Sequence, residues 1–429
     1  MSQLVTDHGS AAPQPPQPRR AEPPTEQRAS LMRLVAVVVA VVLASVVTHT
    51  TSVLIVVVAL VVMIMLHELG HLLAAKWSRM KVTEYFLGFG PRLWSIRRGE
   101  TEYGIKAIPA GGYVKILGMT SAEEVDPGDE PRTYRQRPFH NRLIVAVAGS
   151  AMHGVMAFLL LWGLFVFIGA PQNNTVAISG FAPLAHGVDP ARAAGFRSGD
   201  VVVSAQGSPV RSAQDLQNVI LHHAGKPITV VVDRAGRQRS IVVTPAADAS
   251  VKGANGRIGV MIGPPPAVPS NPVVAFGQAG RQLGTMVSGT FVGLGRVFSP
   301  GGLSNYVHDV TSAKAANQAA KTDNRPASIY GAARLAVQGA QAGTTQLIYV
   351  LVLIIVSVGI LNLLPMLPLD GGHVLIAVYE RIRSRRGRMY HADVSKLTPV
   401  VAAFVLLLGF IVVTSLYLDI THPVKNPFQ

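Results

Sequence analysis

One feature of the sequence limits the possible folds most strongly. It is an apolar run that leads into two histidines and a glutamate. Residues 54–66 are wholly apolar, and His67-Glu68-Leu69-Gly70-His71 follows without a break. A run of this kind is typical of a helix in a lipid bilayer. Ionisable side chains at membrane depth are costly, so they are interpreted first as functional. The run therefore predicts a core transmembrane helix at 53–76 that carries a polar site.

The H-E-x-x-H pattern in this run has the spacing of a metal site. On a helix, His67 and His71 leave the same face one turn apart, so two neutral imidazoles reach one Zn²⁺. Glu68 lies close enough to act on a metal-bound water. The alternative is a chance match, at a rate of roughly a few per cent, with hydrogen-bonded core histidines. Two histidines and a glutamate within one turn of a membrane helix favour the metal.

Composition and charge indicate a membrane protein. Only 14% of the 429 residues are charged, and the formal net charge is +15. The basic residues gather in loops beside apolar spans, which suits anionic lipid and the positive-inside rule. No RNA- or DNA-reading motif is present, so no nucleic-acid partner is expected. The chain has no cysteine, which excludes disulfides and thiolate metal sites.

Apolar and polar segments alternate along the chain. Residues 1–30 form a Pro-rich tail that is expected to be disordered and cytoplasmic. Nine segments are expected after it: an extra transmembrane helix at 31–48, the H-E-x-x-H core helix at 53–76, a cytoplasmic loop with a membrane-associated β-hairpin at 77–140, a second core helix at 141–169, a soluble unit at 172–264, amphipathic or peripheral helices and a loop at 271–343, a core helix with the L-D-G motif at 344–372, a basic cytoplasmic loop at 373–398 and a last transmembrane helix at 399–418.

Two segments outside the spans have strand patterns. Residues 102–115 alternate in hydrophobicity and then turn at glycines, which is typical of a β-hairpin; a plain connecting loop is the alternative. Residues 300–330 have no strong pattern and are expected to be a polar loop. The soluble unit combines one helix at 213–222 with short β-branched runs at 175–178, 201–203, 228–232 and 241–243.

Basic residues also predict the orientation in the membrane. The arginines after the 53–76 helix and the block from Arg381 to Arg388 should face the cytoplasm. With five spans, the amino terminus is then cytoplasmic, and the soluble unit and the carboxyl terminus lie outside. The basic residues of the amino-terminal tail agree with the same threading.

Zinc held by two histidines needs a third protein ligand and an open position for water. Asp370 is the best acidic candidate in an apolar context, since two helix-breaking prolines precede it and two glycines follow it. A carboxylate at membrane depth needs a partner, which the two histidines would supply. Taken alone, Asp370 could equally well be a cap of the following helix and not a metal ligand. The two stretches together favour the metal site.

These motifs together resemble those of bacterial site-2 proteases of the regulator-of-sigma-E-protease (RseP-like) type, in particular the actinobacterial members. The resemblance covers residues 53–418. It is carried by H-E-L-G-H at 67–71, N-x-x-P…L-D-G-G at 362–372, G-F-G-P at 88–91, I-P-x-G-G-Y-V-K at 108–115, A-G-S at 148–150 and a PDZ-like pattern at 189–201.

The resemblance implies a zinc-dependent intramembrane metalloendopeptidase of the bacterial cell membrane. His67, His71 and Asp370 would hold Zn²⁺, and Glu68 would be the general base that activates the water. The implied fold is a polytopic α-helical membrane protein of about five spans, with a membrane-associated β-hairpin and an extracytoplasmic α+β PDZ domain.

The resemblance also assigns substrate contacts. Asn362 would hold the substrate backbone or the developing oxyanion, and the hairpin at Gly111, Gly112 and Tyr113 would pair with the substrate as an added strand. The PDZ domain would admit only single-span membrane proteins, such as anti-sigma factors, that another protease has already shortened. This order of cleavage is regulated intramembrane proteolysis.

The chain departs from the family pattern at several points, among them His153, the position of Pro368 and Phe196 in the PDZ-like pattern, and two other function classes remain. His153 stands where the family often has asparagine; it would be a hydrogen-bond donor, a third histidine of the site or purely structural. A non-catalytic PDZ membrane scaffold is an alternative, although a scaffold has no need of Glu68. A transporter that uses intramembrane His and Asp is another, but the internal repeats typical of transporters are absent from the sequence.

Overall fold

The computed structural model describes residues 24–119, 123–169, 175–182, 184, 189–248, 255–263, 265, 267–322, 325–384, 390, 392–424 and 426. Most of the expected Pro-rich tail and the second half of the expected Arg381–Arg388 block lie outside the described residues. The chain forms two compact units, Met1–Met156 with Thr290–Gln429 and Ala157–Gly289. Each unit is described by itself.

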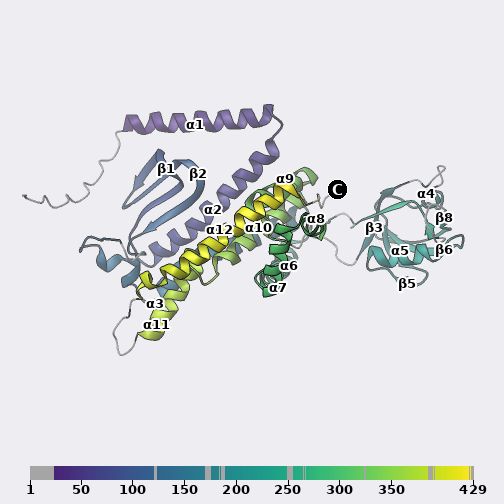
Figure 1. Cartoon of the computed structure of the whole chain (residues 1–429). Coiled ribbons are helices and arrows are strands. Elements are labelled where there is room, and N and C mark those ends of the chain that lie inside the picture. The colour runs from purple at the N-terminus through teal and green to yellow at the C-terminus, as the bar shows by residue number, and fades with distance from the viewer. Residues whose placement is uncertain are drawn as a thin grey trace, which may run out of the picture. The chain divides into compact units, whose positions relative to one another are not determined.

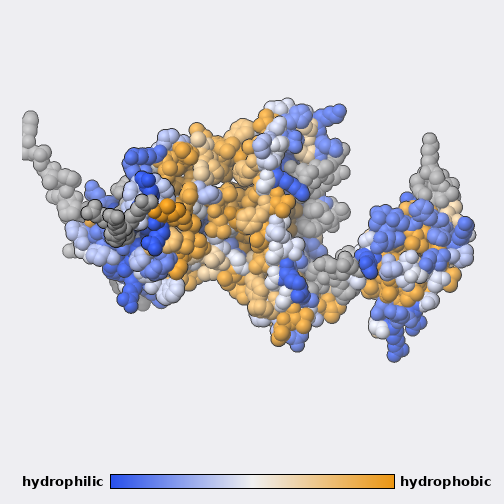
Figure 2. Space-filling model, turned by 90° about the horizontal axis from the view of Figure 1, so that it is seen from below, coloured by the Kyte–Doolittle hydropathy of each residue, from blue (hydrophilic) through white to orange (hydrophobic). Residues whose placement is uncertain are grey.

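Five helices in the described part of the chain are long and apolar enough to cross a membrane, which confirms the expected polytopic membrane protein. Only 6% of the spanning segments of the first and last helices is buried, so their apolar side chains face outward, as contact with lipid requires. Figure 2 shows apolar side chains over much of the larger unit's visible face. The five are α1 (Pro24–Val47), α2 (Thr51–Trp77), α3 (Phe139–Phe167), α10 (Thr344–Asn362) and α12 (Thr398–Thr421) (Figure 1).

The span expected at 344–372 is shorter than the sequence suggested. Helix α10 ends at Asn362, and α11 (Asp370–Arg383) begins at Asp370. The segment between them contains the two prolines, which lack the N–H that a helix needs. The glycines let the next turn pack tightly: a Cβ on Gly371 would lie 2.2 Å from the Leu364 carbonyl oxygen. Asp370 is thus placed in the first turn of a new helix.

The expected hairpin is part of a larger sheet. Strand β1 (Val82–Arg98) pairs antiparallel with β2 (Thr101–Ile116), so residues 102–115 form most of one strand and the hairpin turn lies at 99–100. Both strands bend, and residues 84–87 pair with 112–115 and also with 102–105. Residues 112–116 pair with β1 alone among the described residues and so form an outer edge.

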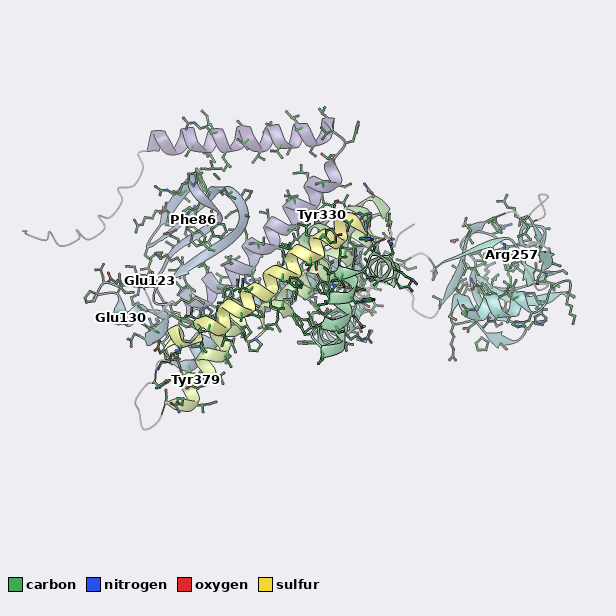
Figure 3. The ribbon with its side chains drawn as sticks, in the orientation of Figure 1. Phe86, Glu123, Glu130, Arg257, Tyr330 and Tyr379 are labelled. Atoms are coloured by element: carbon green, nitrogen blue, oxygen red, sulfur yellow. The ribbon has the colours of Figure 1, made fainter. Side chains whose placement is uncertain are left out.

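This sheet packs on α2 and α3 through one apolar cluster. Phe86, 1% exposed, lies within the sheet (Figure 3). Two short 3₁₀ turns, η1 (Glu130–Arg132) and η2 (Tyr134–Gln136), lead from the sheet to α3. The cluster joins α2, the sheet, η2 and α3 through Leu72, Ala74, Ala75, Met80, Val82, Ile116, Tyr134 and Val145.

The loop expected at 300–330 is largely helical. Ser299 caps a helix, because its Oγ accepts a hydrogen bond from the Gly302 N–H at 3.0 Å and Pro300 occupies the first helical position. The alanine-rich sequence that follows has high helix propensity. The helices of this region are α6 (Pro272–Val297), α7 (Pro300–Thr311), α8 (Ala313–Thr322) and α9 (Ile329–Ala342), and a 3₁₀ turn, η4 (Val394–Leu397), precedes α12.

The smaller unit contains a six-stranded sheet in the order β10-β3-β4-β6-β7, with β5 on β4. Its strands include the predicted β-branched runs, and its core contains Ile178, Val202, Leu216, Ile228 and Val230. A separate pair, β8–β9, completes it. The elements are β3 (Val176–Phe181), α4 (Pro190–Ala193), β4 (Val201–Ala205), β5 (Ser208–Pro209), α5 (Ala213–Leu221), β6 (Ile228–Arg234), β7 (Arg237–Val243), β8 (Ala246–Asp248), β9 (Asn255–Arg257) and β10 (Val260–Gly263).

Candidate metal centre

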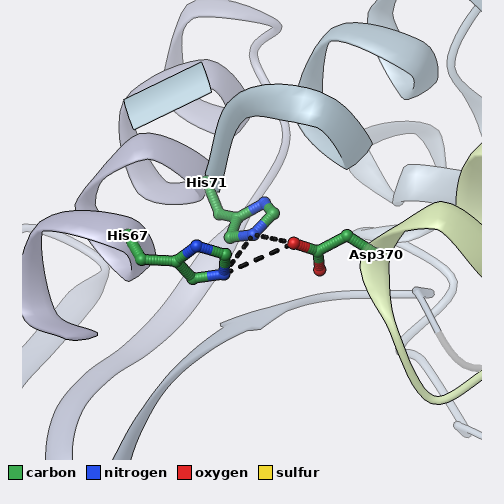
Figure 4. A group of neighbouring side chains, drawn as sticks. All are labelled: His67, His71 and Asp370. Atoms are coloured by element: carbon green, nitrogen blue, oxygen red, sulfur yellow. Dashed lines mark hydrogen bonds and ion pairs between the residues drawn. The ribbon is translucent and has the colours of Figure 1, made fainter. Parts of the chain in front are cut away.

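Three predicted ligands from two distant stretches meet at one point. His67 and His71 project from α2, and Asp370 projects from the start of α11 (Figure 4). The Nε2 atoms of both histidines lie 3.3 Å from Asp370 Oδ2 and 3.3 Å from each other. Both histidines are buried, at 8% and 4% exposure. The structure therefore brings together the two halves of the predicted site.

The donor set fits a divalent metal ion. His71 Nδ1 lies 2.8 Å from the Val145 carbonyl oxygen; as the donor in this bond, it leaves the Nε2 lone pair free to bind a metal. Asp370 Oδ2 is buried and accepts no hydrogen bond from the described residues. Ligands held about 2.0–2.1 Å from a tetrahedral zinc ion lie about 3.3 Å apart, which matches the three observed distances.

Helix α3 supports the centre from one side through a glycine. A Cβ on Gly149 would lie 2.3 Å from His71 Nε2 and 2.7 Å from His67 Nε2. A Cβ on Gly70 of α2 would lie 2.6 Å from the Ala148 carbonyl oxygen. The two helices can approach this closely only because both positions lack a side chain. Gly149 belongs to the A-G-S motif, but the sequence alone gives no role for it. Only the packing shows that a Cβ at this position would collide with both imidazoles.

Glu68 lies where the outer strand of the sheet meets α2. A Cβ on Gly112 would lie 3.2 Å from Glu68 Cγ, and the backbone N–H of Val114 bonds to the Glu68 carboxylate. The predicted base and the predicted substrate-pairing segment are therefore neighbours. This contact gives the carboxylate a position beside a strand edge.

The three other predicted substrate contacts have different surroundings. The Tyr113 hydroxyl accepts a hydrogen bond from Lys106 Nζ at 2.6 Å and donates one to Glu84. Burial raises the pKa of Tyr113, and the neighbouring Glu84 carboxylate raises it further. Gly111 has φ +150° and lies against the Phe89 ring. Asn362 ends α10 and is half-buried. Their substrate roles stay predictions.

A cavity of about 420 Å³ lies over the sheet and apart from the metal centre. Its charged lining is already paired: Arg92 bonds to Glu102, and Lys106 bonds to Tyr113. It contains none of the convergent metal-binding atoms. The chemistry therefore centres on the three-residue cluster and not on this cavity.

Known proteins are similar in sequence to most of this chain. Residues 55–408 match the model of peptidase family M50, a range that includes all three candidate ligands. The chain is 32% identical over 397 residues to zinc metalloprotease Rip1 of Mycobacterium tuberculosis, covering 85% of this chain and 95% of the relative. It is 33% identical over 405 residues to the Rip1 of Mycolicibacterium smegmatis, with the same coverages. A putative zinc metalloprotease of Nostoc is 32% identical over 332 residues, covering 75% and 84%.

Proposed function

The chain belongs to peptidase family M50, and from this premise we propose that it is an intramembrane endopeptidase that hydrolyses peptide bonds within transmembrane segments. It is a multi-pass membrane protein and a metalloprotease whose metal is Zn²⁺. The observation that carries the proposal is the meeting of Asp370, at the start of α11, with both H-E-x-x-H imidazoles of the apolar helix α2.

Each residue of the centre has its own role in amide hydrolysis. His67, His71 and Asp370 would hold zinc, which, when bound, acidifies a water toward a pKa of about 7 and polarises the scissile carbonyl. Glu68 takes the proton of the attacking water and gives it to the leaving amine. The hydrogen bond from Val114 orients the Glu68 carboxylate for this transfer.

The outer edge of the sheet supports a mode of substrate binding. A transmembrane helix hides its amides and must unwind before it is cut, which exposes backbone groups that need partners. The edge at residues 112–116 pairs with no strand besides β1 among the described residues, and Gly112 lies against Glu68. A substrate segment added to this edge as a strand would be held beside the base.

The smaller unit would be a PDZ domain outside the cytoplasm that selects substrates. Its support is the PDZ-like pattern at 189–201, which forms α4 and leads into β4 of the six-stranded sheet. The proposed substrates are single-span membrane proteins, such as anti-sigma factors, after a first cut by another protease. A non-catalytic scaffold is less well supported, because it would not need the buried ligand cluster.

The proposal is tested with the full-length chain in detergent and in cells. Glu68→Gln should abolish cleavage of a membrane-embedded peptide and keep stoichiometric zinc, while a chelator should stop the wild-type reaction. Glu124→Gln, at an exposed position, is the matched control. Membrane fragments that accumulate only with Glu68→Gln are candidate substrates. A chelator-resistant reaction, or full activity of Glu68→Gln, would refute the mechanism.

A further inference from the structure

A third histidine lies beside the metal centre. His153 projects from α3 one turn after Gly149, so both residues lie on the helix face that meets α2. The His153 ring centroid is 5.0 Å from that of His67, at an interplanar angle of 51°. The residue is 2% exposed. His153 therefore extends the row of imidazoles formed by His71 and His67.

One ring nitrogen of His153 lacks the hydrogen bond that a structural histidine normally has. Its Nδ1 is buried and has no hydrogen-bond partner among the described residues. Leaving a buried polar atom unpaired costs about 1–3 kcal/mol, so such atoms usually have a partner. His71 shows the ordinary arrangement, since its Nδ1 bonds to the Val145 carbonyl. The partner of His153 is expected to come from outside the protein chain.

The arrangement separates His153 from the metal ligands. The ligand atoms of His67, His71 and Asp370 all lie within 4.8 Å of one another, and His153 is not a member of this group. A group beside the ligands, and not among them, is placed to contact what binds next to the ion. In a peptidase, that is the peptide bond under attack.

Helix α10 fixes the position of the His153 ring. A Cβ on Gly359 would lie 2.8 Å from His153 Cβ and 3.2 Å from its Cγ. The close helix backbone leaves the side chain little freedom, although its Nδ1 has no hydrogen-bond partner among the described residues. A donor held in place before the substrate arrives has no ordering cost during the reaction, which makes it effective in transition-state stabilisation.

We propose that His153 is a catalytic residue that donates a ring N–H to the oxygen of the scissile carbonyl, an inference that rests on the proposed peptidase function. As water attacks the carbonyl carbon, the electron pair of the C=O π bond moves onto that oxygen, and the His153 N–H bonds to it. His153 keeps its proton. When the C–N bond breaks, the electron pair returns to the C=O bond, and the proton taken by Glu68 goes to the leaving amine.

The test compares full-length variants for zinc content, kcat and KM with one membrane-embedded peptide. His153→Leu should keep stoichiometric zinc and lower kcat by about 10²–10³-fold, with KM within about 2-fold. His153→Gln restores a side-chain N–H donor and should recover at least about 10-fold of that loss. His140→Leu removes an exposed histidine of the same helix and should match the wild type.

Of two further measurements, the first does not depend on turnover and the second does not remove the ring. A phosphinic peptide, which mimics the tetrahedral state, should bind His153→Leu more weakly than the wild type by a similar factor. Gly359→Ala displaces the His153 ring and should lower kcat while zinc is retained.

The outcomes separate the two hypotheses. Wild-type kcat and inhibitor affinity in His153→Leu would overturn the assignment of His153 alone. Loss of zinc from His153→Leu, with full activity after reconstitution, would also overturn it, because the residue would then only support the metal. Absence of zinc-dependent cleavage by the wild type would overturn the proposed function itself.

Discussion

Arg142 and Glu380 form a buried ion pair that joins the first turn of α3 to the last turn of α11. Their side chains are 7% and 6% exposed, and Glu380 Oε1 also accepts a hydrogen bond from the Ala392 N–H at 2.7 Å. Helix α3 carries the carbonyl that orients His71, and α11 begins with Asp370. The pair therefore ties together the two helices that set the geometry of the metal centre.

Breaking this pair should weaken both the fold and zinc binding. Arg142→Met leaves the Glu380 charge buried and unpaired, which should cost about 3–5 kcal/mol of stability. Because α11 then loses its anchor on α3, zinc affinity should fall by about 10–100-fold. Denaturant titration and competition with a zinc chelator measure the two effects.

The controls for this experiment use a second pair and a double variant. Arg132→Met removes a partner of Glu100 from a more exposed pair and should cost about 0–1 kcal/mol. Arg142→Met with Glu380→Met removes both charges and should recover most of the stability. Unchanged zinc affinity in Arg142→Met would show that the pair does not position Asp370.

A methyl group at Gly149 should displace the metal ligands. The added Cβ of Gly149→Ala would lie 2.3 Å from His71 Nε2, and helix α3 cannot move away without opening its contact with Gly70. We expect zinc occupancy to fall below about a tenth at a zinc concentration that saturates the wild type. Gly154→Ala is the matched control, because its Cβ would meet nothing within 4 Å. Metal analysis of purified protein decides the matter, and full occupancy in Gly149→Ala would contradict the structure.

A side chain at Gly112 should disturb the base and leave the metal alone. The Cβ of Gly112→Val would lie 3.2 Å from Glu68 Cγ and 3.2 Å from Ile64 Cγ2. The larger side chain should push Glu68 or the strand edge aside and lower kcat/KM by about 10²-fold or more, since general-base catalysis contributes about 10²–10⁴-fold. Zinc content should stay stoichiometric. Gly128→Val, in an exposed turn with open space around it, should cleave at the wild-type rate.

Local patterns were sufficient to predict the ligands, whereas contacts across the fold were not. His67 and His71 follow from helical spacing, and Asp370 follows from prolines and glycines that place a carboxylate at a break between helices. The prediction that these three residues meet depended on the occurrence of both motifs together in the family. The contact of Gly149 with both imidazoles and the Arg142–Glu380 pair join residues far apart in sequence, and a single sequence contains no signal for either.

The errors in secondary structure have local physical causes. The sequence pattern predicts the hairpin too late in the chain, because the G-F-G-P segment does not look like a strand. In the structure it is a bend within β1, where Gly88 has φ +85°. Residues 300–330 show no strong pattern in the sequence because the buried face of α8 consists of small alanines, Ala316, Ala319 and Ala320. Tyr306 instead anchors α7 on α12, where its hydroxyl bonds to Thr414 and Ser415.

In the smaller unit, Asp200 should make folding sensitive to acid. Asp200 is 1% exposed; Arg234 donates to both of its oxygens at 2.6 and 2.7 Å, and the Arg197 N–H donates at 2.8 Å. Burial opposes ionisation, but these donors outweigh it and hold the Asp200 pKa below its ordinary value. The unfolded chain binds this proton near pH 3.9, at about the ordinary pKa, so the stabilisation is complete above that pH and is lost as the pH falls through the folded pKa.

Hydrogen exchange of the full-length chain measures this effect, followed on backbone amides of β4 and β6. Protection in the wild type should be steady from pH 7 to about 5, after correction for intrinsic exchange rates, and should fall below about pH 4. Asp200→Asn should already lose about 1.5–3 kcal/mol at pH 7, because it removes hydrogen bonds to a charged group. The variant should then show a flatter dependence on pH in the acid range. An acid-induced loss of equal size in Asp200→Asn would mean that other carboxylates control the stability of this sheet.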